Sequence, residues 1–264
     1  DFDADIVVQS AHKTLPAMTM ASYIHIRSEL VNHDRVAHYL RMLQSSSPSY
    51  VLMASLDDAR AYVESYLETD AKFCLEKRDQ WIEAITAIPD VEVITVDDPL
   101  KLLIRVKGYT GNQIREALEA EGIYIELADP VQVLAIMPLL KYGEVYDYAM
   151  ARTRFKNAMV RLKSQKKQEA RVENMLETQK VSTPLLSLEQ VQENKKEWIP
   201  YMRAIGKISA SMVIPYPPGI PLILPGEKIS VAKLTQLEEL ISTGANFQGN
   251  HRLEEKLIQV ISEA

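Results

Sequence analysis

Five of the chain's 13 prolines lie between Pro215 and Pro225, within residues 213–227. Proline fixes φ and has no amide donor, so a stretch this rich in proline cannot form a regular helix or a central strand. We therefore expect a rigid, irregular loop. Because the loop also carries apolar residues such as Ile220 and Leu222, we expect it to pack near an active site or a dimer interface. The alternative is a ligand for a polyproline-binding partner.

The rest of the sequence is typical of an α/β protein, in which short apolar runs alternate with segments of helical spacing. Strands are expected over residues 6–8, 91–96, 102–106, 123–127 and 131–136. Helices are expected over residues 34–44, 57–88 with a break near Thr69, 110–121, 188–198, 230–242 and 252–262, with a long helix or helix pair near 142–180. Thr110 is expected to cap its helix and Gly122 to end it.

Length and composition limit the class of protein. With 264 residues, 47% of them hydrophobic and 25% charged, the chain is long enough for about two folded domains. Every apolar run is far shorter than the roughly 18 residues of a membrane span, so we expect no membrane contact. The formal charge of −6 argues against nucleic acid as a partner, because phosphate binding needs positive charge. We read the basic stretch from Arg152 to Arg171 as a solvated helix face.

Cysteine and histidine usage gives further limits. The single cysteine, Cys74, cannot close an internal disulfide or complete a four-ligand zinc site, so we expect a cytoplasmic protein. Because Cys74 lies on an amphipathic helix beside Phe73 and Leu75, we expect a packed thiol rather than a nucleophile. The histidines lack the spacing of metal ligands, and no metal site is expected. The sequence begins at Asp1 without an initiator Met, which indicates part of a longer polypeptide.

Lys13 is the sharpest signal for chemistry, in the segment Gln9-Ser10-Ala11-His12-Lys13 after an apolar strand. The carboxyl edge of a strand in an α/β sheet is where ligands bind. Partial desolvation there would favour the neutral amine, which forms a Schiff base with an aldehyde such as pyridoxal phosphate. The Ser10 hydroxyl and the His12 imidazole are suitable phosphate ligands. On these residues alone, a solvated surface lysine is the alternative.

Three separated segments carry a family resemblance. They are residues 5–15 (DIVVQSAHKTL), residues 47–57 (SPSYVLMASLD), and residues 216–221 (YPPGIP) followed by 225–227 (PGE). In this order they resemble the ornithine/lysine/arginine decarboxylase family, and they span nearly the whole chain. The resemblance is greatest to the short bacterial type that includes biosynthetic arginine decarboxylases.

The resemblance implies an enzyme of fold type I, similar to aspartate aminotransferase in its large domain, that uses pyridoxal 5'-phosphate (PLP). It also implies a homodimer or a larger homo-oligomer. Lys13 is then the catalytic lysine that forms the Schiff base, and Ser10 and His12 contact the cofactor phosphate. Ser46, in a serine-rich loop, is expected to approach the cofactor of the neighbouring subunit.

A domain organisation follows from the same resemblance. Residues 1–90 are expected to be the carboxyl-terminal part of the PLP-binding large domain, and residues 91–264 a smaller α+β carboxyl-terminal domain. In the family, the phosphate-gripping loop, the residue stacked on the pyridine ring and the aspartate at the ring nitrogen lie upstream of the lysine. They have no counterpart here, so we expect this chain alone to be inactive.

The implied reaction is decarboxylation of a basic amino acid in polyamine metabolism, with arginine to agmatine ahead of lysine to cadaverine, and ornithine as a third substrate. A cationic substrate needs acidic groups, for which Glu126, Asp129 and Glu227 are candidates; each is otherwise a surface acid. Two alternatives stay open. One is a non-catalytic oligomerisation or regulatory module derived from such an enzyme, and the other is an aminotransferase.

Overall fold

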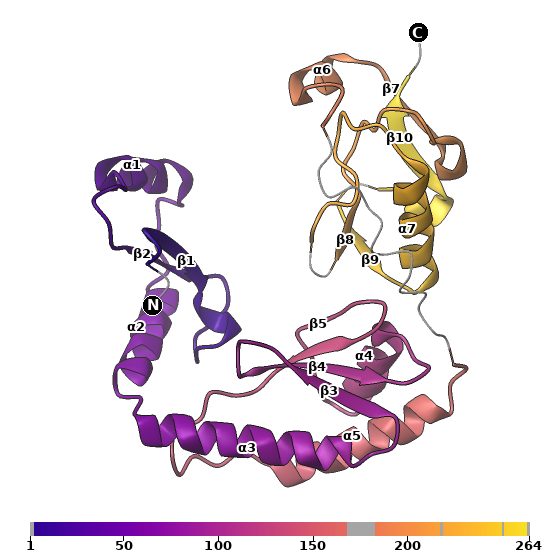
Figure 1. Cartoon of the computed structure of the whole chain (residues 1–264). Helices are drawn as coiled ribbons and strands as arrows, with labels where there is room; N and C mark the ends of the chain where they lie inside the picture. The colour runs from indigo at the N-terminus through magenta and orange to yellow at the C-terminus, as the bar shows by residue number, and fades with distance from the viewer. Residues whose placement is uncertain (1–2, 168–182, 217–218, 250, 263–264) are drawn as a thin grey trace. The chain divides into compact units, whose positions relative to one another are not determined.

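The computed structural model describes residues 3–167, 183–216, 219–249 and 251–262 (Figure 1). The chain divides into two compact units. The amino-terminal unit comprises Asp1–Gln80 and Ile136–Tyr146, and the carboxyl-terminal unit comprises Trp81–Ala135 and Asp147–Ala264. No helix among the described residues is long and apolar enough to cross a membrane.

The amino-terminal unit combines a hairpin with helices. Its elements are β1 (Ile6–Ser10), the 3₁₀ turn η1 (Ala11–Lys13), β2 (Ser22–Ile26), α1 (His33–Leu43), α2 (Tyr50–Glu64) and the first part of α3 (Glu68–Thr86). Strands β1 and β2 pair antiparallel, with Val8 opposite Ile24. The β-branched run in β1 favours this extended conformation. Asn32 and Ser49 cap α1 and α2 through their side chains, as their residue types favour.

Tyrosine side chains of α2 and of the turn after it hold residues 138–144, which we call the strap. The Tyr62 hydroxyl lies 3.0 Å from the Leu139 carbonyl oxygen, and the Tyr66 hydroxyl lies 3.0 Å from the Leu140 carbonyl oxygen. Burial, together with a neighbouring carboxylate, raises the pKa of Tyr62 to about 12, and burial also raises the pKa of Tyr66. Both hydroxyls therefore stay protonated at neutral pH and can donate to the strap.

Asp70 ties the start of α3 to the strap, and its side chain makes stability depend on pH. The carboxylate accepts hydrogen bonds from the backbone N–H groups of Leu67 at 2.7 Å and Tyr142 at 2.8 Å, and these bonds lower the pKa of Asp70. A carboxyl group with a lowered pKa stabilises the fold above its unfolded pKa of about 4, and this contribution is lost as the pH falls through the folded value. We expect Asp70→Asn to unfold at a lower urea concentration than the wild type at pH 7, and the difference to shrink below about pH 4.

Urea unfolding at the two pH values measures this contribution. Asp58, an exposed residue of α2, is the matched control, because its carboxyl group has no comparable burial. An equal loss of stability in Asp58→Asn would contradict the role of Asp70.

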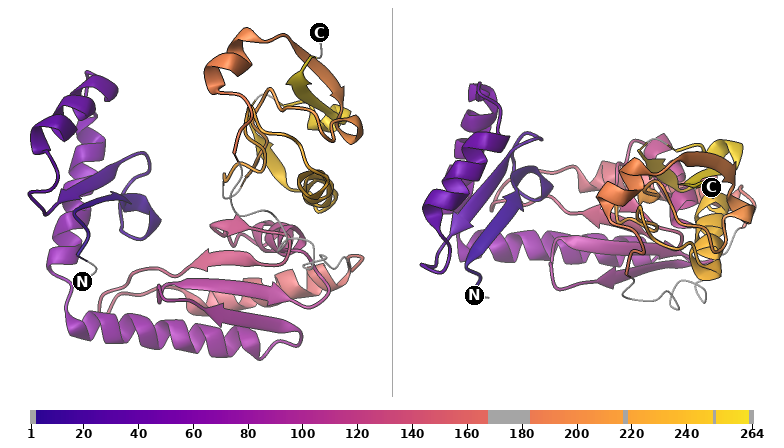
Figure 2. Two further views of the ribbon diagram at one scale, coloured as in Figure 1. Left: turned by 45° about the horizontal axis from the view of Figure 1, so that its top comes forward. Right: turned by 90° about the horizontal axis from the view of Figure 1, so that it is seen from above.

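The carboxyl-terminal unit contains a four-stranded sheet with the order β3-β4-β6-β5. Its elements are β3 (Val91–Thr95), β4 (Lys101–Val106), α4 (Gly111–Ala120), β5 (Leu127–Ala128), β6 (Val133–Ile136) and α5 (Tyr148–Lys163). Helix α4 lies against β4 and β5 and packs along α5 (Figure 2). Along β4 every second residue is buried, including Leu102 and Ile104, which is the period of a strand with one covered face.

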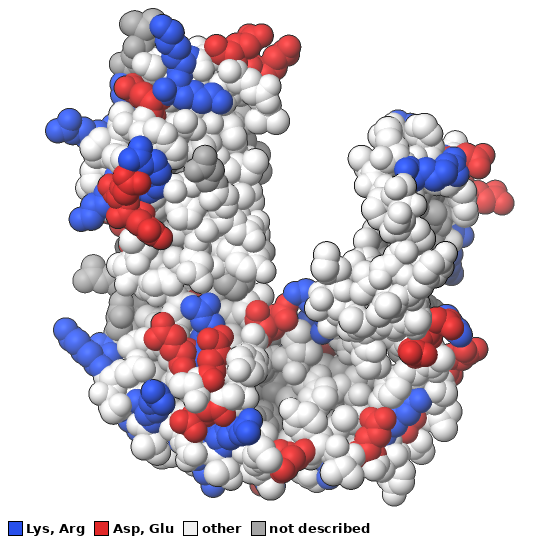
Figure 3. All heavy atoms as spheres, turned by 180° about the vertical axis from the view of Figure 1, so that it is seen from behind, with Lys and Arg blue, Asp and Glu red and all other residues white. Residues whose placement is uncertain are grey.

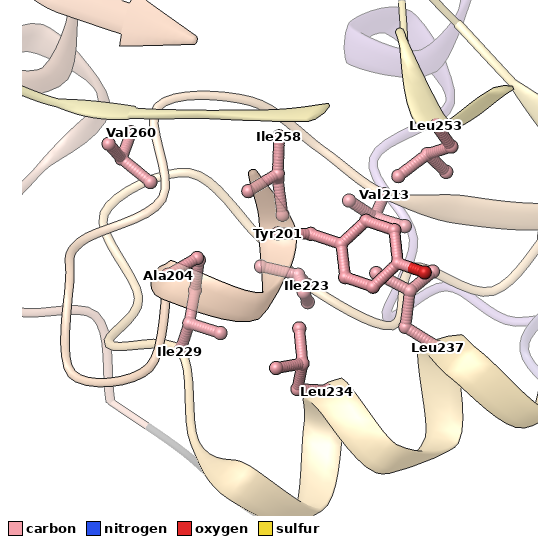
Figure 4. Packing of buried hydrophobic residues seen from close by; sticks show 10 residues of the cluster. All are labelled: Tyr201, Ala204, Val213, Ile223, Ile229, Leu234, Leu237, Leu253, Ile258 and Val260. Atoms are coloured by element: carbon pink, nitrogen blue, oxygen red, sulfur yellow. The ribbon is translucent and has the colours of Figure 1, made fainter. Parts of the chain in front are cut away.

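Residues 183–262 of the same unit form a second core around α7 (Val231–Ser242). The other elements of this part are α6 (Leu188–Glu193), β7 (Lys196–Pro200), η3 (Tyr201–Arg203), β8 (Ile214–Tyr216), β9 (Asn246–Gln248), η4 (Leu253–Glu255) and β10 (Leu257–Ile261). Strand β7 pairs with β10, and β8 pairs with β9. Leu234 and Leu237 of α7 belong to one buried cluster with Ile223 and Ile258 (Figure 4).

Several expected elements are confirmed. The first two predicted strands of the four-stranded sheet are β3 and β4, and the helix expected after Ser230 is α7. Thr110 caps α4 as expected. Its side chain accepts from the Gln113 N–H at 3.3 Å, while the Gln113 side chain accepts from the Thr110 N–H at 3.1 Å, forming a capping box.

One predicted carboxyl-terminal helix is wrong, and a second is shorter than expected. The helix expected over 252–262 is the short turn η4 followed by β10, because Lys256 has φ 61° and breaks the helical path. The helix expected over 188–198 ends at Glu193, and β7 follows. A short apolar run has a similar pattern in a buried strand and in a helix, and pairing of β7 with β10 decides between them.

Four further expectations are corrected in extent. The helix expected over 57–88 is α2 and α3, separated by residues 65–67 rather than near Thr69. The long helix near 142–180 is α5 where it is described, and residues 168–182 lie outside the described residues. The strand expected over 123–127 is the two-residue β5. The proline-rich loop contains the short strand β8, which tolerates Pro215 because it belongs to a two-stranded ladder without a central strand.

Candidate functional site

The end of β1 and the turn η1 place Ser10, His12 and Lys13 within one short stretch of backbone. Ser10 is the last residue of β1 and the N-cap residue of η1, and its hydroxyl makes no capping hydrogen bond. His12 and Lys13 are the last two residues of η1. The structure therefore brings a hydroxyl, an imidazole and an amine to the same turn, as the sequence predicted.

The exposure of this turn differs from the expectation. The apolar run before Lys13 suggested a buried strand and a partly desolvated lysine, but Lys13 is exposed and Val8 of β1 is 69% exposed. Among the described residues β1 pairs with β2, and its apolar side chains keep an uncovered face. Desolvation of the Lys13 amine therefore does not come from the described part of the chain.

His12 carries an orphaned polar atom. Its Nδ1 is buried and has no hydrogen-bond partner among the described residues. Leaving a buried polar atom unpaired costs free energy, so such an atom commonly marks a position that a ligand completes. An N–H at Nδ1 and the Ser10 hydroxyl can each donate to an anionic oxygen, which fits the phosphate of PLP.

Ser46 lies in the same unit, in the loop between α1 and α2, and its side chain is exposed. The neighbouring Ser45 hydroxyl donates to the Ser47 carbonyl at 3.4 Å, and Ser49 caps α2. The approach of Ser46 to the cofactor of a second subunit stays a prediction.

The acidic candidates belong to the carboxyl-terminal unit, whereas Lys13 belongs to the amino-terminal unit. Glu126 precedes β5, is half-buried, and donates its backbone N–H to the Leu134 carbonyl at 2.9 Å. The Asp129 carboxylate accepts two backbone hydrogen bonds within its own turn. A substrate-binding role for Glu126 stays a prediction. The Asp129 carboxylate stabilises the turn between β5 and β6.

Glu227 is not the surface acid that was the alternative to a binding role. Its side chain is buried, with the residue only 3% exposed, and it forms an ion pair with Lys233 at 2.5 Å. The same carboxylate oxygen accepts from the Leu224 N–H at 2.9 Å. Glu227 thus fixes the end of the proline-rich segment to α7, and an incoming cation would have to compete with Lys233.

Two other expectations concern Cys74 and the basic stretch. Cys74 is a packed thiol as expected, since it is buried and its Sγ lies 3.4 Å from the Pro138 carbonyl oxygen. Helix α5 buries one apolar face and exposes basic side chains, and Arg161 lies 3.9 Å from a Glu121 carboxylate. Arg171 lies outside the described residues. On the face drawn in Figure 3, acidic and basic side chains are intermixed.

Ser55 is a residue of the site that the sequence pattern does not single out. This residue lies in an apolar turn of α2, and its Oγ accepts a hydrogen bond from the Met18 N–H at 2.8 Å, in the loop after Lys13. The available signal was a small polar residue on the half-buried side of an amphipathic helix. That signal does not specify a partner 37 residues away.

Comparison with known proteins gives a consistent result. Residues 3–96 match a family model described as Orn/Lys/Arg decarboxylase, major domain, and residues 165–250 match the C-terminal domain of the same family. An uncharacterized Bacillus subtilis protein, YaaO, is 39% identical over 98% of this chain and 55% of its own length. Arginine decarboxylase of Bacillus anthracis is 30% identical over the same shares of the two chains.

Solved structures give the fold. The Francisella novicida lysine decarboxylase matches with a TM-score of 0.73 at 19% identity, over 97% of this chain and 49% of that chain. The Escherichia coli constitutive lysine decarboxylase matches with a TM-score of 0.71 over the same shares. The expected fold class is confirmed. The chain spans about half the length of the curated relatives that it matches.

Proposed function

Because the chain belongs to the Orn/Lys/Arg decarboxylase family, we propose that it contributes to PLP-dependent decarboxylation of a basic amino acid, with arginine favoured over lysine. The observation that carries this proposal is the turn formed by β1 and η1, where Ser10, His12 and Lys13 lie together. This turn falls within the region that matches the major domain. The arginine preference is supported by relatives that are arginine decarboxylases at up to 31% identity, against 22–23% for the lysine decarboxylases.

The residues of the turn have different roles in this proposal. Bound PLP supplies an electron-accepting ring system for the electron pair left when carbon dioxide departs. The Lys13 amine would hold the cofactor covalently, and as a free amine it could act as a base and proton carrier. Ser10 and the unpaired Nδ1 of His12 bind the phosphate and so fix the cofactor relative to Lys13.

Substrate selection requires an acidic or polar group near the cationic end of the amino acid. Glu126 is our candidate for this group, and Glu227 is a weaker one, since a substrate cation would compete with Lys233 for its carboxylate. Removing a charged partner from a substrate cation costs binding energy on the order of 1.5–3 kcal/mol. The choice between arginine, lysine and ornithine therefore rests on groups that recognise the side chain, and the assay below includes all three amino acids.

We also propose that the amino-terminal unit needs a further protein surface. Large apolar side chains of β1, β2, α1 and α2 are exposed, among them Val8, Ile24, Leu43 and Val51. Exposed large apolar side chains on all four of these elements favour a surface that another protein surface covers. We propose that the rest of the major domain and a second subunit cover these side chains. This chain alone is then inactive.

The free thiol of Cys74 supports a reducing compartment, the cytoplasm.

Carbon dioxide release from L-arginine, L-lysine and L-ornithine, with added PLP, tests the proposed function. This chain is assayed beside the longest natural polypeptide that contains it. We expect release from arginine with the long form, and none above background with this chain alone. No carbon dioxide release by either form would contradict decarboxylation and favour a non-catalytic oligomerisation or regulatory module. A keto-acid product would indicate an aminotransferase.

A further inference from the structure

We infer that Ser55 is a positioning residue for Lys13, acting through a hydrogen bond to the loop that follows the lysine. The inference rests on the proposed function for its catalytic consequence. Its structural part, an anchor between α2 and that loop, is independent of the cofactor.

Residues 14–21, which we call the Lys13 loop, connect η1 to β2. Both ends of the loop form backbone hydrogen bonds with Ala11. The Leu15 N–H donates to the Ala11 carbonyl at 2.9 Å, and the Ala11 N–H donates to the Ala21 carbonyl at 3.4 Å. The backbone position of Lys13 is therefore coupled to the conformation of the loop.

Helix α2 holds the middle of the loop. The Met18 N–H donates to the Ser55 Oγ at 2.8 Å. At the next residue of α2, the Leu56 carbonyl accepts a hydrogen bond from the Tyr23 hydroxyl of β2. One turn of α2 thus fixes both the Lys13 loop and the strand into which it leads.

The role of the Ser55 hydroxyl is unusual for a helix interior. Serine within a helix commonly bonds back to a carbonyl of the preceding turn, which adds nothing to tertiary structure. Here its oxygen accepts from a segment 37 residues away. Alanine at this position would leave the Met18 N–H without this acceptor.

The Lys13 loop also contains a strained residue, which explains why an anchor is needed. Met20 has φ 78°, in the left-handed region that favours glycine, and its side chain is 88% exposed. A residue in this conformation persists where the surrounding structure holds it. The Ser55 anchor lies two residues before Met20 and restrains the loop on that side.

The consequence for catalysis follows from geometry. The exposed Lys13 side chain is long and flexible, so the placement of its amine depends on a well-defined backbone in η1 and the Lys13 loop. Covalent chemistry requires the amine within bonding reach of one carbon, and small displacements reduce rates strongly. Loss of the anchor should therefore slow the reaction of Lys13 more than it weakens binding of the amino acid.

The test compares Ser55→Ala, Ser55→Thr and a control, Ser65→Ala, in the longest natural polypeptide that contains this chain. Ser65 caps the end of the same helix and contacts Lys141 instead of the Lys13 loop. Amide hydrogen exchange over residues 14–21 reports the anchor without cofactor. The rate of trapping PLP on Lys13 with borohydride, together with kcat and KM for L-arginine, reports the placement of the amine.

We expect Ser55→Ala to speed exchange at Met18 by about fivefold, the effect of losing one hydrogen bond. We expect trapping and kcat to fall by about tenfold with KM little changed. Ser55→Thr keeps the hydroxyl and should restore all three values, and Ser65→Ala should match the wild type.

Unchanged exchange in Ser55→Ala would overturn the anchor. Faster exchange with wild-type trapping and kcat would overturn the positioning role while leaving the proposed function intact. Failure of the wild type to trap PLP at Lys13 would overturn the proposed function and the positioning role together, and the exchange data would still report on the anchor.

Discussion

Replacing Lys13 by alanine is expected to abolish covalent trapping of PLP at this position and to reduce turnover of the complete enzyme by roughly 10²–10⁴-fold or more. The physical reason is that no other group of the β1–η1 turn is an amine. Ser10 and His12 can hold a phosphate, but neither can form the covalent link to an aldehyde. Lys13→Arg is expected to be equally inactive, because the guanidinium stays protonated and is not a nucleophile.

The measurement combines borohydride trapping, read by peptide mass spectrometry, with carbon dioxide release from L-arginine. Lys13 is exposed in the described structure, so its removal should leave the unfolding midpoint nearly unchanged. Lys72→Ala is the matched control, since Lys72 is an exposed lysine of α3 that pairs with Glu68. Turnover near the wild-type level in Lys13→Ala would disprove the assignment of Lys13.

Gly226→Ala is expected to destabilise the carboxyl-terminal unit by about 3 kcal/mol or more. Gly226 has φ 83°, and a Cβ atom there would lie 2.2 Å from the Leu186 carbonyl oxygen. The Gly226 carbonyl meanwhile accepts from the Leu185 N–H at 2.8 Å, so the two backbone segments cannot separate without losing that bond. Alanine therefore adds a backbone clash to the cost of a left-handed conformation.

Gly244→Ala separates these two costs. Gly244 follows α7 with φ 76°, but a Cβ atom there would meet nothing within 4 Å. Its replacement should cost about 1–2 kcal/mol, the left-handed conformation alone. Urea unfolding of both variants gives the comparison. If Gly226→Ala is no more destabilising than Gly244→Ala, the close approach to Leu186 is wrong.

Gly226 also belongs to the PGE segment, residues 225–227, which is part of the family signature. The PGE segment helped to identify the family, and the structure gives each of its last two residues a packing role. Gly226 permits the contact with Leu186, and Glu227 is buried against Lys233. The last two residues of the signature therefore each have a role in the folding of the carboxyl-terminal unit.

Local structure was predictable where one residue type has one strong preference. Thr110 was expected as a helix cap and forms a capping box with Gln113. The turn that carries Ser10, His12 and Lys13 was found because an apolar strand preceded it and a family resemblance supported it. By contrast, residues 252–262 were expected to be helical, because apolar spacing in a short segment does not distinguish a helix from a buried strand.

Properties that depend on distant residues were not predictable. The burial of Glu227 follows from its packing beside α7 and its pairing with Lys233, six residues away. The anchor between Met18 and Ser55, and the hold of Tyr62 and Tyr66 on the strap, join segments separated by tens of residues. No periodicity in the sequence encodes which of many polar side chains will meet across such a distance.

The amino-acid sequence by itself determined the family, the order of most elements and the chemical groups at the turn, because these follow from local preferences and from short motifs. The tertiary structure decided which of those groups are exposed, which carboxylates are already neutralised, and which helix holds the loop after Lys13. Exposure and pairing are properties of atoms brought together by folding, so they are fixed by packing between segments rather than by the residues of any one segment.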